Sequence, residues 1–199
     1  MVHGMKYYAV HKPFGVLCQF TREVAGQQVL SDFFDLKKDI YPVGRLDKDS
    51  EGLLLLTNDK SLNSKLLDPK HAHSRTYFAQ VEGVPTPEAL LKLAAGVSIS
   101  VEGKLYKTRP CTAEIVEPNP PFSERTPPIR VRKSIPDCWV KLTLKEGKNR
   151  QVRKMCAAVG YPVLRLIRVG IEDLQLDGLS SGDLRELNIL ELKQLLKLE

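Results

Sequence analysis

Four consecutive leucines, Leu53 to Leu56, directly follow a strongly charged segment, and this junction constrains the fold more than any other part of the sequence. The stretch reads GRLDKDSEGLLLLTND from residue 44 to residue 59. The charged side chains before the leucines include those of Arg45, Asp47, Asp49 and Glu51. A short apolar run that ends at a turn-forming Asn-Asp pair is typical of a buried β-strand. The sequence therefore predicts a strand over 51–59 in the core, with charges at its beginning.

The rest of the chain mixes strand and helix patterns without a regular alternation. Strand patterns cover 6–13, 15–20, 74–83, 105–117, 139–147 and 161–176. Helix patterns cover 27–34, 61–68, 86–96, 149–160 and 188–198. The proline-rich segment 117–136 predicts a long loop, because proline cannot continue regular structure. This order indicates an α+β fold rather than a doubly wound one.

Composition sets bounds on the class of protein. Thirty Lys and Arg against 24 Asp and Glu give a net charge of +6, which is compatible with a polyanionic partner. The four cysteines have no short spacing, so neither a zinc site nor a disulfide framework is indicated. No apolar run reaches the ~20 residues of a membrane span, and the N-terminus lacks a signal-peptide core. No glycine-rich phosphate loop occurs, so ATP and dinucleotides are not implied. We expect a cytoplasmic protein.

Two interpretations of the charged segment remain open from the residues alone. Asp47, Asp49 and Glu51 would share one face of an extended chain, as paired acid and base carboxylates do in glycosidases. Alternatively, they form a turn whose carboxylates bind nearby backbone amides, with Arg45 as an ion-pair partner. A carboxylate beside a buried strand is partly desolvated, which makes it a stronger nucleophile or base if a cation keeps it ionised.

The densest basic segment is KEGKNRQVRKM, residues 145–155. If a helix begins at Asn149, then Arg150, Arg153 and Lys154 form one cationic stripe near its positive N-terminus. A solvated helix face is the alternative. Further cations are Arg125, Arg130, Arg132 and Lys133 in the proline-rich loop, and Arg165 and Arg168 after it. This placement favours RNA or DNA binding.

Two other features have competing interpretations. Tyr77 could stack on an unpaired base, but an aromatic residue on an alternating strand more often belongs to the core. His71 and His73 are two residues apart with no third ligand near them in sequence, so a loop pair is favoured over a metal site.

Taken together, these motifs resemble a known family. GRLDKDSEGLLLLTND is similar to the catalytic motif of the RsuA group of pseudouridine synthases. The segments HKPFGV, RTYFAQVEG, EGKNRQVRKM and LRLIRVGI fall in that family's order around it, so the resemblance runs from about Lys6 to Glu186. PPFSERTPPIRVRKSIPDCW resembles the branch called RluE, which acts on large-subunit ribosomal RNA.

The resemblance implies a fold and a reaction. The fold would be the α+β pseudouridine synthase catalytic fold, with a mixed, mostly antiparallel sheet, flanking helices and a central RNA-binding cleft. We expect one catalytic domain over 1–199 without an S4 domain, a basic loop at 117–136 and a C-terminal helical segment at 183–199. The reaction would convert a specific uridine of large-subunit ribosomal RNA to pseudouridine, in a monomer that needs no cofactor or metal and has no membrane partner.

The resemblance also implies roles for individual residues. Asp47 would attack C1′ of the target uridine or remove a proton there. Tyr77 would stack on the uracil, Arg153 would pair with Asp47, and Arg45 would lie against the flipped nucleotide or its phosphate. Further RNA contacts are expected from Lys12, Lys148, Arg150, Lys154, Arg125, Arg130, Arg165 and Arg168. These roles suit a reaction that takes a base out of the stack and holds an ionised carboxylate in a dry pocket. The rival functions are a carboxylate-dependent RNA or nucleoside glycosidase and a non-catalytic RNA-binding module.

Overall fold

The computed structural model describes residues 4–129, 132 and 134–198. The chain forms two compact units. Unit 1 consists of residues 1–73 and 168–199, and unit 2 consists of residues 74–167. Strands and helices are mixed in both units, and nearly all strand pairs are antiparallel. The predicted α+β class is therefore confirmed.

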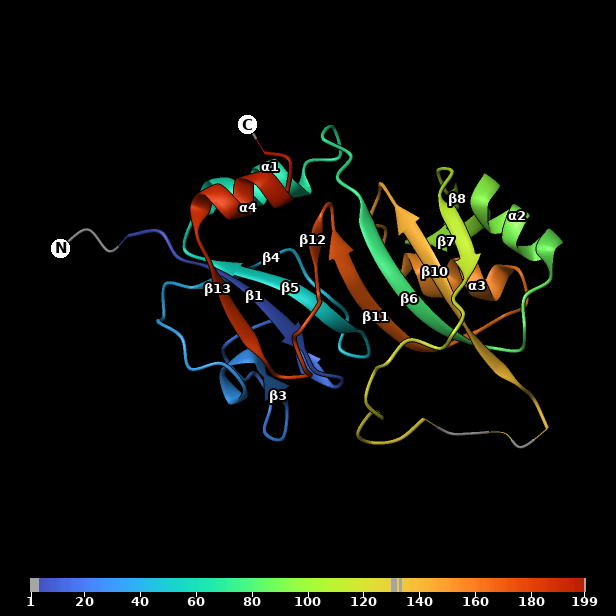
Figure 1. The fold of residues 1–199 in the computed structure, drawn as a ribbon, viewed down its shortest axis with the longest axis horizontal. Coiled ribbons are helices and arrows are strands. Elements are labelled where there is room, and N and C mark those ends of the chain that lie inside the picture. The colour runs from blue at the N-terminus through green and yellow to red at the C-terminus, as the bar shows by residue number, and fades with distance from the viewer. Residues whose placement is uncertain (1–3, 130–131, 133, 199) are drawn as a thin grey trace. The chain divides into compact units, whose positions relative to one another are not determined.

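Unit 1 is built around strand β5, Glu51–Thr57, all seven residues of which are buried. Strand β1 (Tyr7–Lys12) pairs with β5 on one side and with β13 (Leu184–Leu187) on the other, as Figure 1 shows. Strand β4 (Tyr41–Val43) also pairs with β5. Successive side chains of a strand point to opposite faces, so an entirely buried β5 is covered on both faces. The predicted central strand is confirmed.

The register of β1 against β5 fixes which end of β1 lies near the charged segment. Tyr7 is opposite Thr57, and Lys12 is opposite Gly52. Strand β11 (Val163–Ile171) carries the chain from unit 2 into unit 1, where its last residues pair with β12, Leu174–Gln175. The last residues of the charged segment, next to Gly52, therefore lie beside the end of β1 at Lys12.

Helices α1 and α4 of unit 1 each begin after a residue whose side chain caps the helix N-terminus. Helix α1, Lys60–Leu67, begins after Asp59, whose carboxylate accepts a hydrogen bond from the Ser61 amide. Helix α4, Ile189–Leu195, begins after Asn188, whose side-chain oxygen accepts from the Glu191 amide. No helix among the described residues is long and apolar enough to cross a membrane.

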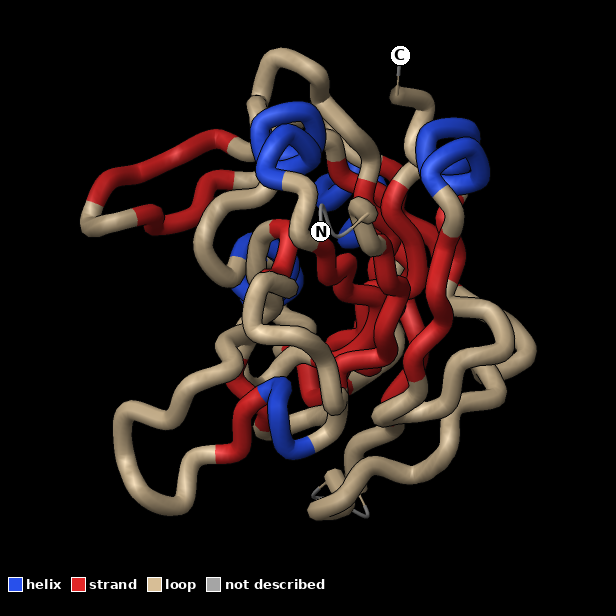
Figure 2. The backbone as a smooth tube through the Cα atoms, turned by 90° about the vertical axis from the view of Figure 1, so that its left-hand side faces the viewer, coloured by secondary structure: helices blue, strands red, loops and turns tan. Residues whose placement is uncertain are grey.

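Three predictions for unit 1 are wrong in detail. The C-terminal segment at 183–199 is not wholly helical, because β13 within it pairs with β1. The segment 27–34 forms strand β3 (Gln28–Val29) and the three-residue 3₁₀ helix Leu30–Asp32 instead of an α-helix. The predicted strand at 15–20 shortens to β2, Val16–Leu17. Figure 2, with loops in tan, shows how much of the backbone lies outside regular elements.

Unit 2 contains strands β6 (Arg75–Glu82), β10 (Asp137–Leu144) and β9 (Thr112–Ile115), with β10 in the middle. Helices α2 (Pro87–Ala95) and α3 (Gln151–Ala158) supply buried residues to the same core. That core includes Ala79, Val81, Leu93, Val140, Leu142, Met155 and Cys156. Apart from the strand predicted at 105–117, the strands and helices predicted here are confirmed within a few residues at their ends.

The predicted strand at 105–117 is wrong as a single element. It divides into β8 (Lys104–Lys107) and β9, with Pro110 between them, because proline has no amide hydrogen for a strand pair. Strand β8 pairs instead with β7 (Ser98–Val101), which the sequence analysis missed. Glu102 and Gly103 have φ angles of 50° and 77°, which is the turn geometry that joins two-residue hairpins.

Candidate active site

Residues 44–50 connect β4 to β5 and form the Asp47 loop. The Leu46 side chain is buried, the Asp47 side chain is partly buried, and the Arg45 side chain is exposed. The Ser50 amide donates to the Asp47 carbonyl at 3.0 Å, which closes a tight turn. The loop therefore leaves Asp47 partly exposed, while its neighbour Leu46 anchors the backbone.

Glycines at both ends of this loop allow close approaches that another residue would prevent. Gly44 has a φ of 70°, and a Cβ atom there would lie 3.0 Å from the Leu67 side chain of α1. Gly52 has a φ of 106°, and a Cβ atom there would lie 2.2 Å from the Arg168 carbonyl oxygen. The beginning of β5 thus packs against the backbone of Arg168 at a distance that only glycine permits.

The predicted role of Lys12 as an RNA contact must be corrected, because its side chain does not reach the surface. Its side chain is fully buried, and its ammonium donates to the carbonyls of Pro13 at 2.9 Å and Val16 at 2.7 Å. Desolvation lowers the pKa of Lys12 to about 8, although the nearby Cys18 and the carboxylates of Glu51, Asp49 and Asp47 act in the opposite direction.

Lys12 is therefore an interior cation beside the Asp47 loop, which was not predicted from the sequence. A single lysine between apolar strand residues and a Pro-Gly turn was the available signal for burial.

The two arginines of β11 are also buried and do not form part of an exposed basic surface. Arg168, 5% exposed, donates from Nε to the Leu53 carbonyl at 2.8 Å in unit 1. One of its terminal nitrogens, Nη2, is buried without a hydrogen-bond partner among the described residues. Arg165 donates to the Ser123 carbonyl at 2.9 Å in unit 2, where it braces the proline-rich loop. As with Lys12, their predicted role as surface RNA contacts is corrected.

Tyr77 lies on β6 opposite Leu142 of β10. It is half-buried and packs against the hydrophobic core of unit 2. Tyr77 therefore belongs partly to the core, which was one of its two interpretations from the sequence, and it also remains partly exposed.

Arg153 lies on α3, where its guanidinium donates to the Val163 carbonyl at 3.3 Å. It is half-buried, whereas the nearby Lys148 and Arg150 are exposed. The helix begins at Gln151 instead of Asn149, because Arg150 has a left-handed φ of 52°. The predicted stripe of three helical cations is wrong in this respect, since Arg150 stands before the helix.

The remaining predicted contacts are surface cations of unit 2. Lys148 is exposed, and its ammonium lies 4.9 Å from the ring centre of Tyr106. The Lys154 ammonium is 3.3 Å from the Asn149 side-chain oxygen. Arg125 donates to the Pro127 carbonyl at 2.9 Å, and Arg130 lies outside the described residues.

The predicted residues thus divide between the two units. Unit 1 carries Asp47, Arg45, Lys12 and Arg168. Unit 2 carries Tyr77, Arg153, Lys148, Arg150, Lys154, Arg125 and Arg165. Within unit 1 the structure brings Lys12 to the carboxylates of the Asp47 loop.

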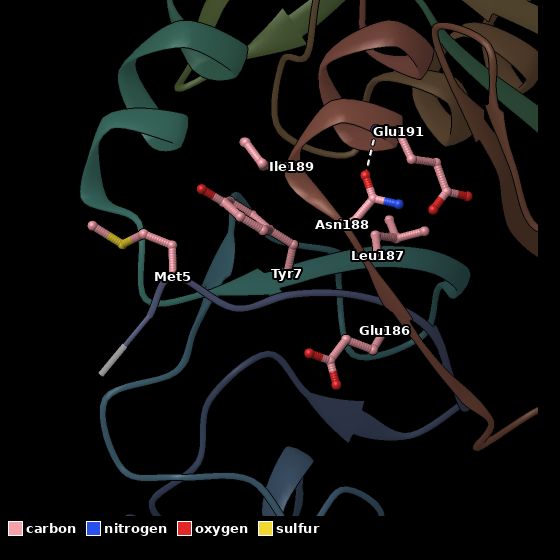
Figure 3. Close-up of a pocket in the computed structure, with 7 residues that line it drawn as sticks. All are labelled: Met5, Tyr7, Glu186, Leu187, Asn188, Ile189 and Glu191. Carbon is pink, nitrogen blue, oxygen red and sulfur yellow. Dashed lines mark hydrogen bonds between the residues drawn. The ribbon is translucent and has the colours of Figure 1, made fainter. Parts of the chain in front are cut away.

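A cavity of about 670 Å³ lies elsewhere in unit 1, and Figure 3 shows its lining. The lining residues are Met5, Tyr7, Glu186, Leu187, Asn188, Ile189 and Glu191. The Tyr7 hydroxyl donates to Asp59 at 2.9 Å, and burial raises the pKa of this hydroxyl to about 12. Tyr7 and Lys12 are at opposite ends of β1, so this cavity is not part of the Asp47 loop.

Comparison with known proteins places these observations in a family. The family model described as RNA pseudouridylate synthase matches residues 6–158. The chain is 48% identical over 172 residues to the ribosomal large subunit pseudouridine synthase E of Xanthomonas axonopodis pv. citri (strain 306), covering 86% of this chain and 88% of that protein. It is 39% identical over 202 residues to the ribosomal large subunit pseudouridine synthase B of Bacillus subtilis (strain 168), covering 98% and 75%.

Comparison with solved structures indicates the same family. A crystal structure of a pseudouridylate synthase superposes with a TM-score of 0.77 at 29% sequence identity, covering 98% of this chain and 75% of that one. The family model spans the Asp47 loop, β6 and α3, which are the segments that supply the three predicted catalytic residues. The chain belongs to the RNA pseudouridylate synthase family.

Proposed function

We propose that this protein converts a uridine of large-subunit ribosomal RNA to pseudouridine, with Asp47 as its catalytic carboxylate. One observation carries the proposal: in a chain of this family, Asp47 is partly exposed on a loop that is anchored directly before a fully buried strand. The relatives named as large-subunit synthases support the choice of RNA. Glu51 is 2% exposed, which favours Asp47 over this second carboxylate as the group that reaches a substrate.

The proposed reaction is an isomerisation without a co-reactant. The bond between uracil N1 and ribose C1′ breaks, and a bond between C5 and C1′ forms. The proton at C5 leaves to solvent, and N1 gains a proton. Asp47 assists by attacking C1′ or by removing a proton from the ribose, so it must be ionised at the start. The Lys12 ammonium is buried beside the loop and places a positive charge near this carboxylate.

Unit 2 would supply the other two catalytic residues. We expect Tyr77 to stack on the uracil, which offsets the unstacking cost of a few kcal/mol for a flipped base. Arg153 would pair with Asp47 through its planar guanidinium, and Arg45 of the loop would contact the nucleotide phosphate. In this proposal the residues of both units belong to one catalytic domain.

The surrounding RNA would be bound mainly through phosphate contacts. The exposed or partly exposed cations of unit 2 suited to this are Lys148, Arg150, Lys154 and Arg125. Such contacts hold the RNA in register without reading its sequence. We further propose that the enzyme works as a monomer in the cytoplasm.

The test is release of tritium from large-subunit ribosomal RNA transcribed with uridine tritiated at C5. Isomerisation must expel this tritium, because C5 becomes the atom bonded to ribose. We expect stoichiometric release with the wild type, none with Asp47→Asn, and no free uracil with either.

Asp49→Asn is the matched control, since it makes the same chemical change two residues away. It should retain most of the activity, whereas a paired-carboxylate glycosidase would lose activity in both variants and produce free uracil. Full activity of Asp47→Asn would refute the assigned role, and wild-type binding of the RNA without release would favour the non-catalytic RNA-binding module.

A further inference from the structure

The thiol of Cys18 lies against the backbone of the Asp47 loop. The Leu46 amide donates to Cys18 Sγ at 3.2 Å, and the thiol donates to the Leu46 carbonyl at 3.3 Å. Leu46 immediately precedes Asp47 in the chain. One side chain therefore contacts both backbone polar groups of the residue next to the proposed catalytic carboxylate.

These backbone groups belong to a buried part of the loop. The Leu46 side chain is 8% exposed, so its amide and carbonyl would be costly to leave without partners. Strand β2 ends at Leu17, directly before Cys18, although the sequence pattern predicts a strand to residue 20. Cys18 thus uses its side chain to hold a segment 28 residues away in sequence.

Neighbouring residues of the same segment hold the loop on the other side of Asp47. The Gly15 amide donates to the Lys48 carbonyl at 2.9 Å, and the Lys12 ammonium lies 3.5 Å from the same oxygen. Hydrogen bonds therefore hold the loop backbone at Leu46 and at Lys48, the two neighbours of Asp47. The Gly15 contact comes from the backbone, and replacing Lys12 would remove a buried charge. The Cys18 side chain can be replaced without either complication.

The thiol remains protonated at neutral pH, as donation to a carbonyl requires. Burial raises the pKa of Cys18, while the Leu46 amide and the positive charges of Lys12 and Arg168 lower it to a smaller extent. A thiol that is partly buried and protonated is a poor nucleophile, which argues against a reactive role.

We propose that Cys18 is a positioning residue that sets the place of the Asp47 carboxylate through the Leu46 backbone, without contacting the substrate. This inference rests on the proposed function of Asp47. Because a misplacement of about 1 Å can reduce a rate about a hundredfold, loss of this contact should affect the chemical step and leave RNA affinity nearly unchanged.

The experiment compares Cys18→Ala, Cys18→Val and Cys18→Ser by single-turnover tritium release and by the Kd for the same RNA. Alanine removes the contact, valine fills the space without hydrogen bonding, and serine can still donate and accept. We expect alanine and valine to lower the single-turnover rate about ten- to a hundredfold with Kd within about twofold of wild type. Serine should recover most of the lost rate.

Cys111→Ala is the matched control. The Cys111 thiol donates to the Leu93 carbonyl at 3.3 Å in unit 2, so the same change removes a thiol contact to a backbone carbonyl away from the loop. Cys111→Ala should leave the single-turnover rate at the wild-type value. Each rate is measured well below the melting temperature of the variant, so that unfolded protein does not lower the measured rate.

The outcomes separate this inference from the function on which it rests. Wild-type protein that releases no tritium would contradict the proposed function itself. Wild-type release together with an unchanged rate in Cys18→Val would overturn only the positioning role. A parallel loss of rate and RNA affinity that serine does not restore would also overturn it, because that pattern marks a general structural role. If alanine prevents folding, valine and serine still decide between these results.

Discussion

Replacement of Gly52 by alanine should destabilise the protein by about 3 kcal/mol or more. A residue with a side chain held at the φ of 106° found for Gly52 costs on the order of 1–3 kcal/mol. The added Cβ would also lie 2.2 Å from the Arg168 carbonyl oxygen, whereas ordinary van der Waals contact begins at 3.4 Å. That atom is backbone and cannot rotate away. Separating the two segments would weaken the 2.8 Å bond from Arg168 to the Leu53 carbonyl, a charged hydrogen bond worth about 1.5–3 kcal/mol.

The control for this prediction is Gly178→Ala in the same unit. Gly178 has a φ of 75°, but an added Cβ would meet no atom within 4 Å, so only the backbone cost of about 1 kcal/mol applies. Urea unfolding and thermal unfolding, both followed by circular dichroism, compare the two variants with the wild type. The Gly52 variant should lose roughly 6–12 °C in Tm, at about 2–4 °C per kcal/mol for a chain of this size. Equal losses of stability in the two variants would refute the close approach of β5 to Arg168.

Three other perturbations test separate parts of the structure. Lys12→Met should make the pH dependence of stability flatter, because between pH 8 and 10.5 the unfolded wild type binds the lysine proton and the folded wild type does not. Over this range the free energy of unfolding of the wild type should rise by about 3 kcal/mol relative to that of the variant. Urea unfolding of both proteins at several pH values measures this rise, and an equal pH dependence in the two proteins would disprove it. Arg150→Gly should stabilise the protein by about 0.5–1 kcal/mol by relieving the left-handed backbone, and should lower the salt dependence of RNA binding by about one unit of slope; Arg150→Gln should show only the second effect. Tyr77→Phe should keep the single-turnover rate within a few-fold of wild type if the ring acts by stacking, whereas Tyr77→Ala should lose most of it at similar RNA affinity.

Elements with complete local signals were predicted well. Helix α2 has Thr86 as N-cap, Pro87 in its first turn and Gly96 after its end, and it forms where these residues indicate. Strand β5 was equally clear, since a run of leucines between charges and an Asn-Asp turn has few other solutions. In both cases the residues that decide the structure lie within a dozen positions of one another.

Elements that depend on distant partners were missed or misread. Strand β13 has three exposed residues of four and no apolar alternation, and it is a strand because β1 offers it a pairing edge. The hairpin of β7 and β8 turns at Glu102-Gly103, where glutamate occupies a left-handed conformation that its sequence does not favour. In these places tertiary contacts outweigh local preference.

The Asp47 loop shows the same division between local and distant information. Asp47 and Arg45 could be proposed from the sequence because the motif that contains them is contiguous, and the structure leaves both residues at least partly exposed. Lys12 was misassigned because a cation was taken to be exposed, yet its ammonium is enclosed by backbone carbonyls of its own turn. Cys18 could not be identified, since its importance comes from Leu46, which no sequence pattern links to it. Residues that carry out chemistry have local signatures, whereas residues that hold them in place are defined by the fold. The positioning residues are therefore where variants of this chain test the structure most directly.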